Sequence, residues 1–377
     1  MDADRGHGGD RRQSRGRRGL RDPRPARPAG RGTRTVSAGG PGGAVRRSGA
    51  GELPATGTAA LLDRDVRTAE VLARDPAGVA RPASVVRRYA QRPVAVAAGL
   101  VLTILVLAAA LAPLIAPADP TPPLTPEVLA QAREGPSWDH PFGTDKLGRD
   151  QLSRVLYGLR VSLTVGIGVA VLSVLAGVAV GAWAGWRGGW VDGVLMRFTD
   201  LFLVIPALVV LLVVASNPDP SFFGLFDLPP ATGVPGMVLL LAALGWMPMA
   251  RIVRGEFLSL RERDYVEASR AAGASSWHIV VRHLLPNTVG PIVVFATLAV
   301  GIAVLNEAVL SFLGAGVQYP TVSLGQMIAD AEETVGSDLA YLIVYPGLVL
   351  FVLVLAINLV GDGLRDAMDP HSRDGAR

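Results

Sequence analysis

The chain has 377 residues, of which half are hydrophobic and 18% are charged, and it contains no cysteine. This composition, with a positive mean hydropathy, indicates a protein that crosses a membrane several times. The absence of cysteine excludes disulfides and thiol chemistry. The net charge of +4 is unevenly distributed: residues 1–92 hold 20 arginines against 9 acidic residues, so the remainder carries about −7.

Residues 1–81 form a tail that is rich in Arg, Gly and Pro and has no aromatic residue. Such a segment cannot bury enough apolar surface to offset the entropy lost on ordering, so we expect it to be disordered. Arginine-rich runs without interleaved aromatic residues are usually solvated, and we therefore expect no specific nucleic-acid binding. The tail is also not expected to be a secretory signal, since the first apolar run begins after residue 90.

Six apolar runs are long enough to cross a bilayer as helices. They are residues 94–115, 161–186, 196–215, 234–253, 291–313 and 340–360. Prolines within these runs predict kinked helices, at Pro206, Pro248 and Pro346. Small residues in the second run predict close helix packing, at Gly166, Gly177, Gly181 and Gly185.

The basic residues predict an orientation for these spans. Arginines precede the first run, follow the last, and crowd the segment between the fourth and the fifth, whereas residues 216–233 and 314–339 contain no Lys or Arg. By the positive-inside rule, both termini and residues 261–287 are expected in the cytoplasm. The spans themselves are expected to contact membrane lipid. Residues 116–160 are then an external loop, although they carry charges of both signs.

The polar segment of residues 261–287 is expected to have structure of its own. Asp264, followed three residues later by Glu267, predicts a capping box that starts a short helix. Gly273 can adopt the left-handed conformation that ends it, and Ser275 or Ser276 can cap a second helix.

The two short helices are expected to present different faces. The second places four apolar side chains on one face and should end at Pro286. Those side chains are Trp277, Val280, Val281 and Leu284. On the first helix, Tyr265, Ala268 and Ala272 form a mostly small face that a partner can approach closely.

This segment resembles the EAA pattern of permease subunits of binding-protein-dependent ABC importers. The matching residues are Glu267-Ala268-Ser269, Gly273, Ile279 and Leu285-Pro286, with Ser269 in place of a second Ala. In that family the segment is a coupling helix that docks into a groove of a cytoplasmic ATPase. The resemblance therefore implies that these residues, with Tyr265 and Ala272, couple the chain to an ATPase. The alternative is a plain connection between two spans, in which Glu267 is only a helix cap.

A second set of motifs resembles the C-type permeases of dipeptide and oligopeptide ABC importers, and nickel permeases share much of it. The set runs from Phe142-Gly143-Thr144-Asp145 and Gly148-Arg149-Asp150 to Ser311-Phe312-Leu313-Gly314 and Gly361-Asp362-Gly363. The resemblance implies a second, homologous permease subunit, two cytoplasmic ATPase subunits and an external substrate-binding protein as partners. It also implies the cytoplasmic membrane of a prokaryote as the location.

The expected fold is all-α, with six transmembrane helices in the type I ABC importer arrangement and a cytoplasmic coupling helix. Its expected parts are the cytoplasmic tail of residues 1–81, the first transmembrane helix and external loop at 82–160, the permease domain at 161–363, and a cytoplasmic tail at 364–377.

Polar residues inside the spans are candidates for the translocation path. Asn306 and Glu307 fall in the fifth run, where a carboxylate must find a partner or water. The alternative for Glu307 is a place near the outer end, where it is solvated or caps backbone groups. Arg197 and Asp200, three residues apart, are expected to pair with each other at the inner interface.

The sequence argues against catalysis by this chain. The only lysine, Lys146, does not lie in a nucleotide-binding Gly-Lys-Ser/Thr motif. The nearest histidine pair, His278 and His283, is expected to be splayed on a helix and to form no metal site. We therefore expect no cofactor in this chain, with ATP and Mg bound by the ATPase subunits.

Other functions remain open from the sequence. The chain can be a permease for nickel or another small solute, or an ATP-independent secondary transporter. The second would require more polar residues near the bilayer centre than Glu307 alone. A membrane-anchored interaction scaffold would leave the kinked spans unexplained.

Overall fold

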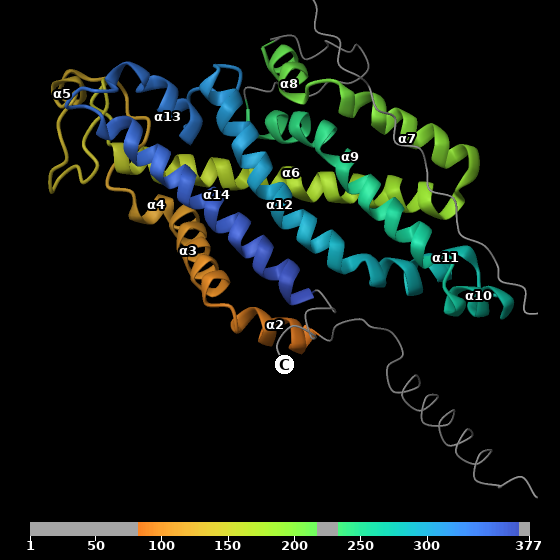
Figure 1. Ribbon diagram of the computed structural model, residues 1–377. Helices are drawn as coiled ribbons and strands as arrows, with labels where there is room; N and C mark the ends of the chain where they lie inside the picture. Colours follow the sequence, from red (N-terminus) through yellow and green to blue (C-terminus); the bar gives the residue numbers. More distant parts are fainter. Residues whose placement is uncertain (1–81, 217–232, 369–377) are drawn as a thin grey trace, which may run out of the picture. The chain divides into compact units, whose positions relative to one another are not determined.

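The computed structural model describes residues 82–216 and 233–368, so the tail predicted at 1–81 and most of the loop predicted at 216–233 lie outside the described residues (Figure 1). The described residues are mainly helical. The helices are α2 (Pro82–Ala90), α3 (Pro93–Ala110), α4 (Ala112–Ile115), α5 (Pro126–Ala130), α6 (Gln151–Arg187), α7 (Gly189–Val204), α8 (Ala207–Ala215), α9 (Val234–Leu260), α10 (Asp264–Ala271), α11 (Ser276–Ile279), α12 (Leu285–Phe312), α13 (Leu324–Asp330) and α14 (Tyr341–Met368), with a π-helical turn at Val280–Leu284 and a 3₁₀ turn at Glu332–Thr334.

In the described part of the chain, five helices are long and apolar enough to cross a membrane, and one bent pair of helices meets the same criterion together. The single helices are α3, α6, α9, α14 and a continuous helix over Ser276–Phe312, and the bent pair is α7 with α8. Four of the six predicted runs therefore coincide, to within one residue, with stretches of unbroken helix, whereas the first run, at 94–115, is divided at Leu111 between α3 and α4.

The run predicted at 196–215 is not one straight helix. Helix α7 ends at Val204 and α8 starts at Ala207, with an angle of 78° between them. Pro206 lies in the break, where its missing N–H and its ring prevent the helix from continuing. The position of the irregularity predicted at Pro206 is thus confirmed, but the structure has a full break there where a kink was predicted. Pro248 and Pro346 remain inside α9 and α14.

The fifth span is longer at its start than its apolar run predicts. The sequence places its beginning at residue 291, but the helix is continuous from Ser276. The second of the two short helices predicted in residues 261–287 is therefore joined to the span through helical backbone.

Glycines set the closeness of the contact between α6 and α9. A Cβ added to Gly177 would lie 2.6 Å from the Cβ of Met249, and one added to Gly181 would lie 2.4 Å from the carbonyl oxygen of Ala250. Because these glycines are four residues apart, they share one face of α6. The predicted close packing is confirmed, and it makes α6 and α9 the most extensive helix pair of the described fold (Figure 1).

The other spans pack around α6 and α12. Helix α12 contacts both α6 and α14, and α14 in turn contacts α3 (Figure 1). Leu159 of α6, Val304 of α12 and Leu353 of α14 are buried in one apolar cluster. Helix α3 keeps large apolar side chains exposed, among them Leu100 and Ile104, as expected for a span that faces lipid.

The loop before α6 is fastened to the start of α14. The ring of Phe142 stacks on Tyr345, with centroids 4.2 Å apart and planes 14° apart. The hydroxyl of Tyr341 donates hydrogen bonds to the carbonyl oxygens of Glu134 and Thr144, at 2.8 and 3.0 Å. Asp150 then caps α6 by accepting from the backbone N–H of Ser153 at 2.7 Å.

Candidate coupling surface

Helix α10 starts one residue earlier than predicted from Asp264 as its N-cap. Its first residue is Asp264, and the N-cap position belongs to Arg263, whose side chain makes no capping hydrogen bond. The predicted roles of Asp264 as the cap and of Glu267 as its reciprocal partner are therefore wrong. Both carboxylates instead lie in the first turn of the helix, where negative charge is stabilised by the helix dipole.

The two faces of α10 have different environments. Val266 is fully buried, in a cluster with Phe257 of α9 and Ile279 of α11. The predicted small face points away from this cluster, and its three members, Tyr265, Ala268 and Ala272, are exposed. Helix α10 is thus attached to the spans on one side and available to a partner on the other.

Gly273 ends α10 as predicted. Its φ is +82°, and the N–H of Ala274 donates to the carbonyl oxygen of Ser269 at 3.1 Å, which is the bond of a Schellman motif. Ser275 then caps α11 by accepting from the N–H of His278 at 3.3 Å. The predicted helix-Gly-helix arrangement is confirmed.

The apolar face predicted for the second helix is wrong in part. Trp277 has an exposed fraction of 76% and Val281 one of 41%, whereas Ile279 and Leu284 are buried. The π-helical turn at Val280–Leu284 changes which residues share a face, because its hydrogen bonds join residues five apart instead of four.

The same turn explains two further corrections. His278 and His283 are not splayed: their ring centroids lie 6.0 Å apart, edge to face. Pro286 does not end the helix, because it falls in the first turn of α12 directly after the π turn. The side chain of Asn287 donates to the carbonyl oxygen of His283 at 2.6 Å, which satisfies a backbone acceptor at this irregular point.

Some residues of the EAA pattern are exposed, and the others are half-buried or buried against the spans. Glu267, Ala268, Gly273 and Pro286 are exposed. Ser269 and Leu285 are half-buried, and Ile279 is buried at 1% exposure. The exposed group can meet a partner directly, and the buried group holds the segment against α9 and α12.

Charged side chains also fasten this end of the spans. Arg254 of α9 pairs with Asp192 of α7, with one N–O distance of 2.6 Å. Asp200 pairs with Arg251 of α9, so the predicted pairing with Arg197 is wrong. The reason is geometric: α9 brings a cation to Asp200 from a neighbouring helix.

Contacts from residues 261–287, the candidate coupling segment, reach the end of α6. Arg261 donates to the carbonyl oxygen of Gly185 at 3.2 Å. The guanidinium carbon of Arg270 lies 5.4 Å from the ring centroid of Trp186, within the range of a cation–π contact. These contacts hold the segment to α6. The packing of Val266 against Phe257 holds it to α9, and its backbone continues into α12.

Tyr265 offers a polar group on the exposed face of α10. Partial burial raises the pKa of its hydroxyl above the ordinary value, and the nearby charge of Arg263 opposes that shift. The hydroxyl is consequently protonated at neutral pH and can donate a hydrogen bond to a partner.

Glu307 lies inside the bundle, away from this surface. Its side chain is fully buried and accepts hydrogen bonds from the hydroxyls of Ser162 on α6 and Ser311 on α12, both at 2.8 Å. The alternative of a solvated position is wrong in this structure. Asn306, the neighbouring residue, is half-buried. Their role in the translocation path stays a prediction.

Sequence reasoning missed the exposure of Trp277 and Val281. A large exposed aromatic side chain beside small exposed alanines is typical of a contact surface between proteins. Pro286 was an available signal, because a proline within a helix leaves a carbonyl group of the preceding turn without its N–H partner, and a π turn is one way to accommodate this.

The described residues form a polytopic helical membrane protein, and one segment, fastened to the end of its spans, exposes a compact surface. Comparison with known families identifies the class of protein. Residues 177–374 match the family described as the binding-protein-dependent transport system inner membrane component, and residues 83–136 match the N-terminal transmembrane domain of oligopeptide transport permease C. The chain belongs to the family of binding-protein-dependent transport permeases and is a permease subunit of an ABC importer.

Similar proteins carry names consistent with this family. The dipeptide transport system permease protein DppC of Bacillus subtilis is 37% identical over 289 residues, which cover 76% of this chain and 85% of the relative. The oligopeptide transport system permease protein OppC of Mycobacterium tuberculosis is 41% identical over 238 residues, covering 63% of this chain and 78% of the relative.

One solved structure that the comparison matches is that of the MetNI methionine ABC transporter in an inward-facing conformation. A chain of that structure is 22% identical, with a TM-score of 0.45, over 57% of this chain and 96% of the solved one.

Proposed function

We propose that this chain forms half of a pore for dipeptides and oligopeptides in the cytoplasmic membrane of a prokaryote. The other half is a homologous permease subunit, two cytoplasmic ATPase subunits drive the cycle, and an external substrate-binding protein delivers the cargo. The names of the relatives, which are dipeptide and oligopeptide permeases, support the cargo assignment.

The observation that carries the proposal is the division of the coupling segment into an exposed and an anchored side. Tyr265, Ala268 and Ala272 face outward with Trp277 nearby on the next helix. Val266 on the opposite side of α10 is buried against the spans. A surface of small side chains around aromatic ones can fit closely into a groove on a second protein.

The coupling mechanism follows from this anchoring. ATP binding, with Mg, takes place in the ATPase subunits and brings them together, and each carries the coupling segment docked on it. Because the segment continues into α12 through helical backbone, its displacement tilts that span. The tilt changes the pore between its two access states. This chain itself hydrolyses no ATP in the proposed cycle.

The test introduces charge and bulk at the centre of the small face. In Ala268→Arg, the arginine side chain cannot enter a groove shaped for a methyl group, so we expect the ATPase subunits to be lost from the purified complex and ATP-dependent peptide uptake to fall at least about tenfold. The matched control is Ala130→Arg, at an exposed alanine of α5 at the far end of the fold.

Two measurements decide the result. Co-purification from membranes measures whether the ATPase subunits remain bound, and proteoliposomes loaded with ATP measure the uptake of a radiolabelled dipeptide. Retention of both by Ala268→Arg would overturn the coupling assignment. Uptake of radioactive nickel in place of peptide by the unaltered complex would move the cargo assignment to the alternative named above.

A further inference from the structure

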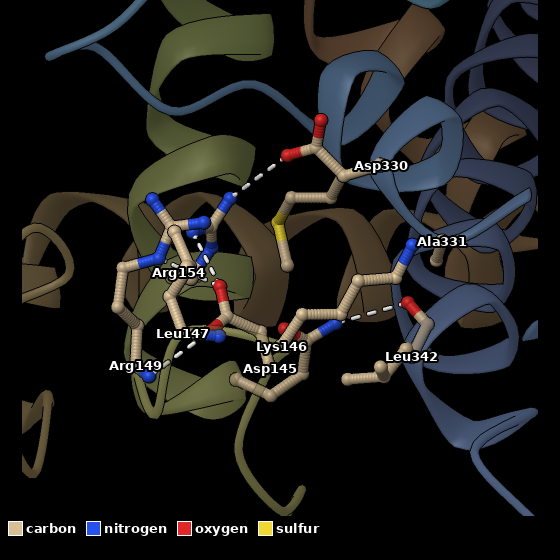
Figure 2. Close-up of a pocket in the computed structure, with 10 residues that line it drawn as sticks. Asp145, Lys146, Leu147, Arg149, Arg154, Asp330, Ala331 and Leu342 are labelled. Carbon is tan, nitrogen blue, oxygen red and sulfur yellow. Dashed lines mark hydrogen bonds and ion pairs between the residues drawn. The ribbon is translucent and has the colours of Figure 1, made fainter. Parts of the chain in front are cut away.

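A cavity of about 330 Å³ lies at the end of α6 opposite the coupling segment (Figure 2). The α6 helix runs for 37 residues between the two, or about 55 Å at 1.5 Å per residue. Charged and apolar side chains line the cavity together. They are Asp145, Lys146, Leu147, Arg149, Gln151 and Arg154, with Met327, Asp330, Ala331 and Leu342.

Asp145 is the acceptor around which the loop is built, and its hydrogen-bonding capacity is used. Its Oδ1 accepts from the backbone N–H groups of Leu147 and Arg149, at 2.8 and 2.9 Å. Its Oδ2 accepts from the Nε of Arg149 at 2.6 Å and from Nη1 of Arg154 at 2.8 Å. Two guanidinium groups therefore share one oxygen of a single carboxylate (Figure 2).

The second carboxylate near these cations is a weak partner. Asp330 of α13 lies 3.5 Å from Nη2 of Arg154, and its side chain is 52% exposed. The side chains of Arg154 and Arg149 are only 3% and 13% exposed. A buried charge is costly unless it is paired, and a pairing at 3.5 Å with a half-solvated group compensates little.

Arg154, which lines the cavity, also has a hydrogen-bond donor without a partner in the described part of the chain. The Nε of Arg154 is buried and has no hydrogen-bond partner among the described residues. A guanidinium group has five N–H donors and no acceptor, so an unpaired buried donor in it leaves a free energy deficit. Lys146 is paired with Glu333 outside the lining, with 3.0 Å between Nζ and Oε2, so the unpaired donor of Arg154 is the feature of the cavity that lacks a partner within the described chain.

We propose that this cavity binds a carboxylate group. A carboxylate is planar and its oxygens accept hydrogen bonds from guanidinium groups, which matches the fork of Arg149 and Arg154 and the unpaired Nε of Arg154. Leu147 and Met327 supply apolar surface for the short carbon chain behind it. The volume lies at the lower end of the range for small-ligand pockets and accommodates one short acid or one acidic side chain.

The carboxylate has two possible sources, a free small acid or an Asp or Glu side chain of the external substrate-binding protein. Both meet the cavity only if it opens on the outer side of the membrane, and for that orientation the inference rests on the proposed function. Binding of a carboxylate by the purified chain does not depend on transport. A failure of this inference can therefore be distinguished from a failure of the proposed function.

The sequence provides a probe at the site. Lys146 is the only lysine of the chain and lines the cavity. Reductive methylation with ¹³C-formaldehyde keeps its charge and places one side-chain NMR signal there. We titrate the methylated full-length chain in nanodiscs with sodium acetate, against sodium chloride at equal ionic strength. A saturable shift with acetate and none with chloride is expected.

Two variants test the chemistry in opposite directions. Arg149→Gln removes one charged arm and should weaken acetate binding about tenfold or more, which corresponds to the loss of a charge-assisted hydrogen bond. Asp330→Asn removes a competing negative charge at a half-exposed position and should strengthen binding, a gain that misfolding cannot produce. Arg160→Gln, at an exposed residue of the same helix, is the control and should leave the affinity unchanged.

A chain that shows no saturable shift with acetate, or an affinity unaltered in both Arg149→Gln and Asp330→Asn, overturns the proposal. A further arm identifies the source by adding the external binding protein to the labelled transporter. If that protein produces the shift and acetate reverses it, the group is an acidic side chain. If acetate shifts the signal and the protein does not, the ligand is a free acid.

Discussion

The backbone at Gly273 has a φ of +82°, yet a Cβ added there would meet no heavy atom within 4 Å. The cost of replacing this glycine therefore comes from conformation and not from crowding. Residues differ strongly in how well they tolerate positive φ: Asn does so readily, and a β-branched residue is a rare outlier. This makes position 273 a graded test of the joint between α10 and α11.

We expect ATP-dependent peptide uptake to be highest in Gly273→Asn, lower in Gly273→Ala and lowest in Gly273→Val. The valine variant should lose most activity while still inserting into the membrane, because the strain of about 1–3 kcal/mol acts on the joint alone. Uptake in proteoliposomes, normalised to the amount of permease, gives the order. Equal uptake by the asparagine and valine variants would show that the joint does not need the left-handed conformation.

Gly181 is constrained by space. A Cβ at this position would lie 2.4 Å from the carbonyl oxygen of Ala250 and 2.9 Å from the Cβ of Val253. We expect Gly181→Leu to force α6 and α9 apart and to destabilise the chain by about 1–3 kcal/mol or more. The control is Gly255→Leu on α9, where a Cβ would meet nothing within 4 Å.

The measurement is the apparent Tm of the purified chain in one detergent, from the fraction that stays monodisperse after heating. A clear fall in Tm for Gly181→Leu with little change for Gly255→Leu is expected. The reverse order would contradict the packing of α6 on α9 described above.

Between elements, Glu307 connects α6 and α12 through two serine hydroxyls. We expect Glu307→Leu to lower the apparent Tm, with a cost of about 1–3 kcal/mol for the hydroxyls that lose their acceptor. Glu307→Gln keeps an acceptor and should cost less.

A double substitution shows whether the effect runs through this contact. If Ser162 and Glu307 act together, Ser162→Ala should cost less in the Glu307→Leu background than in the unaltered chain. Additive costs would mean that the two residues contribute separately to stability.

Sequence patterns predicted the elements better than the joints between them. Apolar runs gave five of the spans, and Gly273 and Ser275 gave the end of α10 and the cap of α11. Asp264 was misjudged as a cap because a one-residue shift in the start of a helix leaves its charge pattern unchanged. The break at Pro206 was read as a kink, since its size depends on how neighbouring helices pack.

The candidate site was predictable where it depends on local sequence. The exposed face of Tyr265, Ala268 and Ala272 follows from helical spacing alone. The exposure of Trp277 was not predictable in this way, because the π turn after it changes the helical phase. The pairing of Asp200 with Arg251 depends on the packing of α7 near α9, which no spacing within one helix reveals.

At the scale of the whole molecule, the orientation in the membrane is the property on which the proposed function depends. The chain contains no cysteine, so a single introduced cysteine is the only thiol in it. Trp277 and Trp138 are both highly exposed and belong to the two opposite ends of the described spans. Each can be replaced by cysteine and tested with a membrane-impermeant maleimide.

We expect Trp138→Cys to react in intact cells and Trp277→Cys to react only after the membrane is permeabilised. The reason is the excess of arginine around the coupling segment, which favours the cytoplasmic side. Labelling is read by mass shift on a gel. Reaction of Trp277→Cys from outside intact cells would place the segment out of reach of any cytoplasmic ATPase.

The unbroken helix from Ser276 to Phe312 has 37 residues and so measures about 55 Å. If a rod of that length pivots at its middle, moving the tip next to residues 261–287 by about 5 Å rotates it by only about 10° and moves the other tip by about 5 Å in the opposite direction. Rotations this small need no melting of backbone hydrogen bonds. In the proposed cycle, a small displacement at residues 261–287 would therefore reach the other end of this helix as a change in the aperture of the pore.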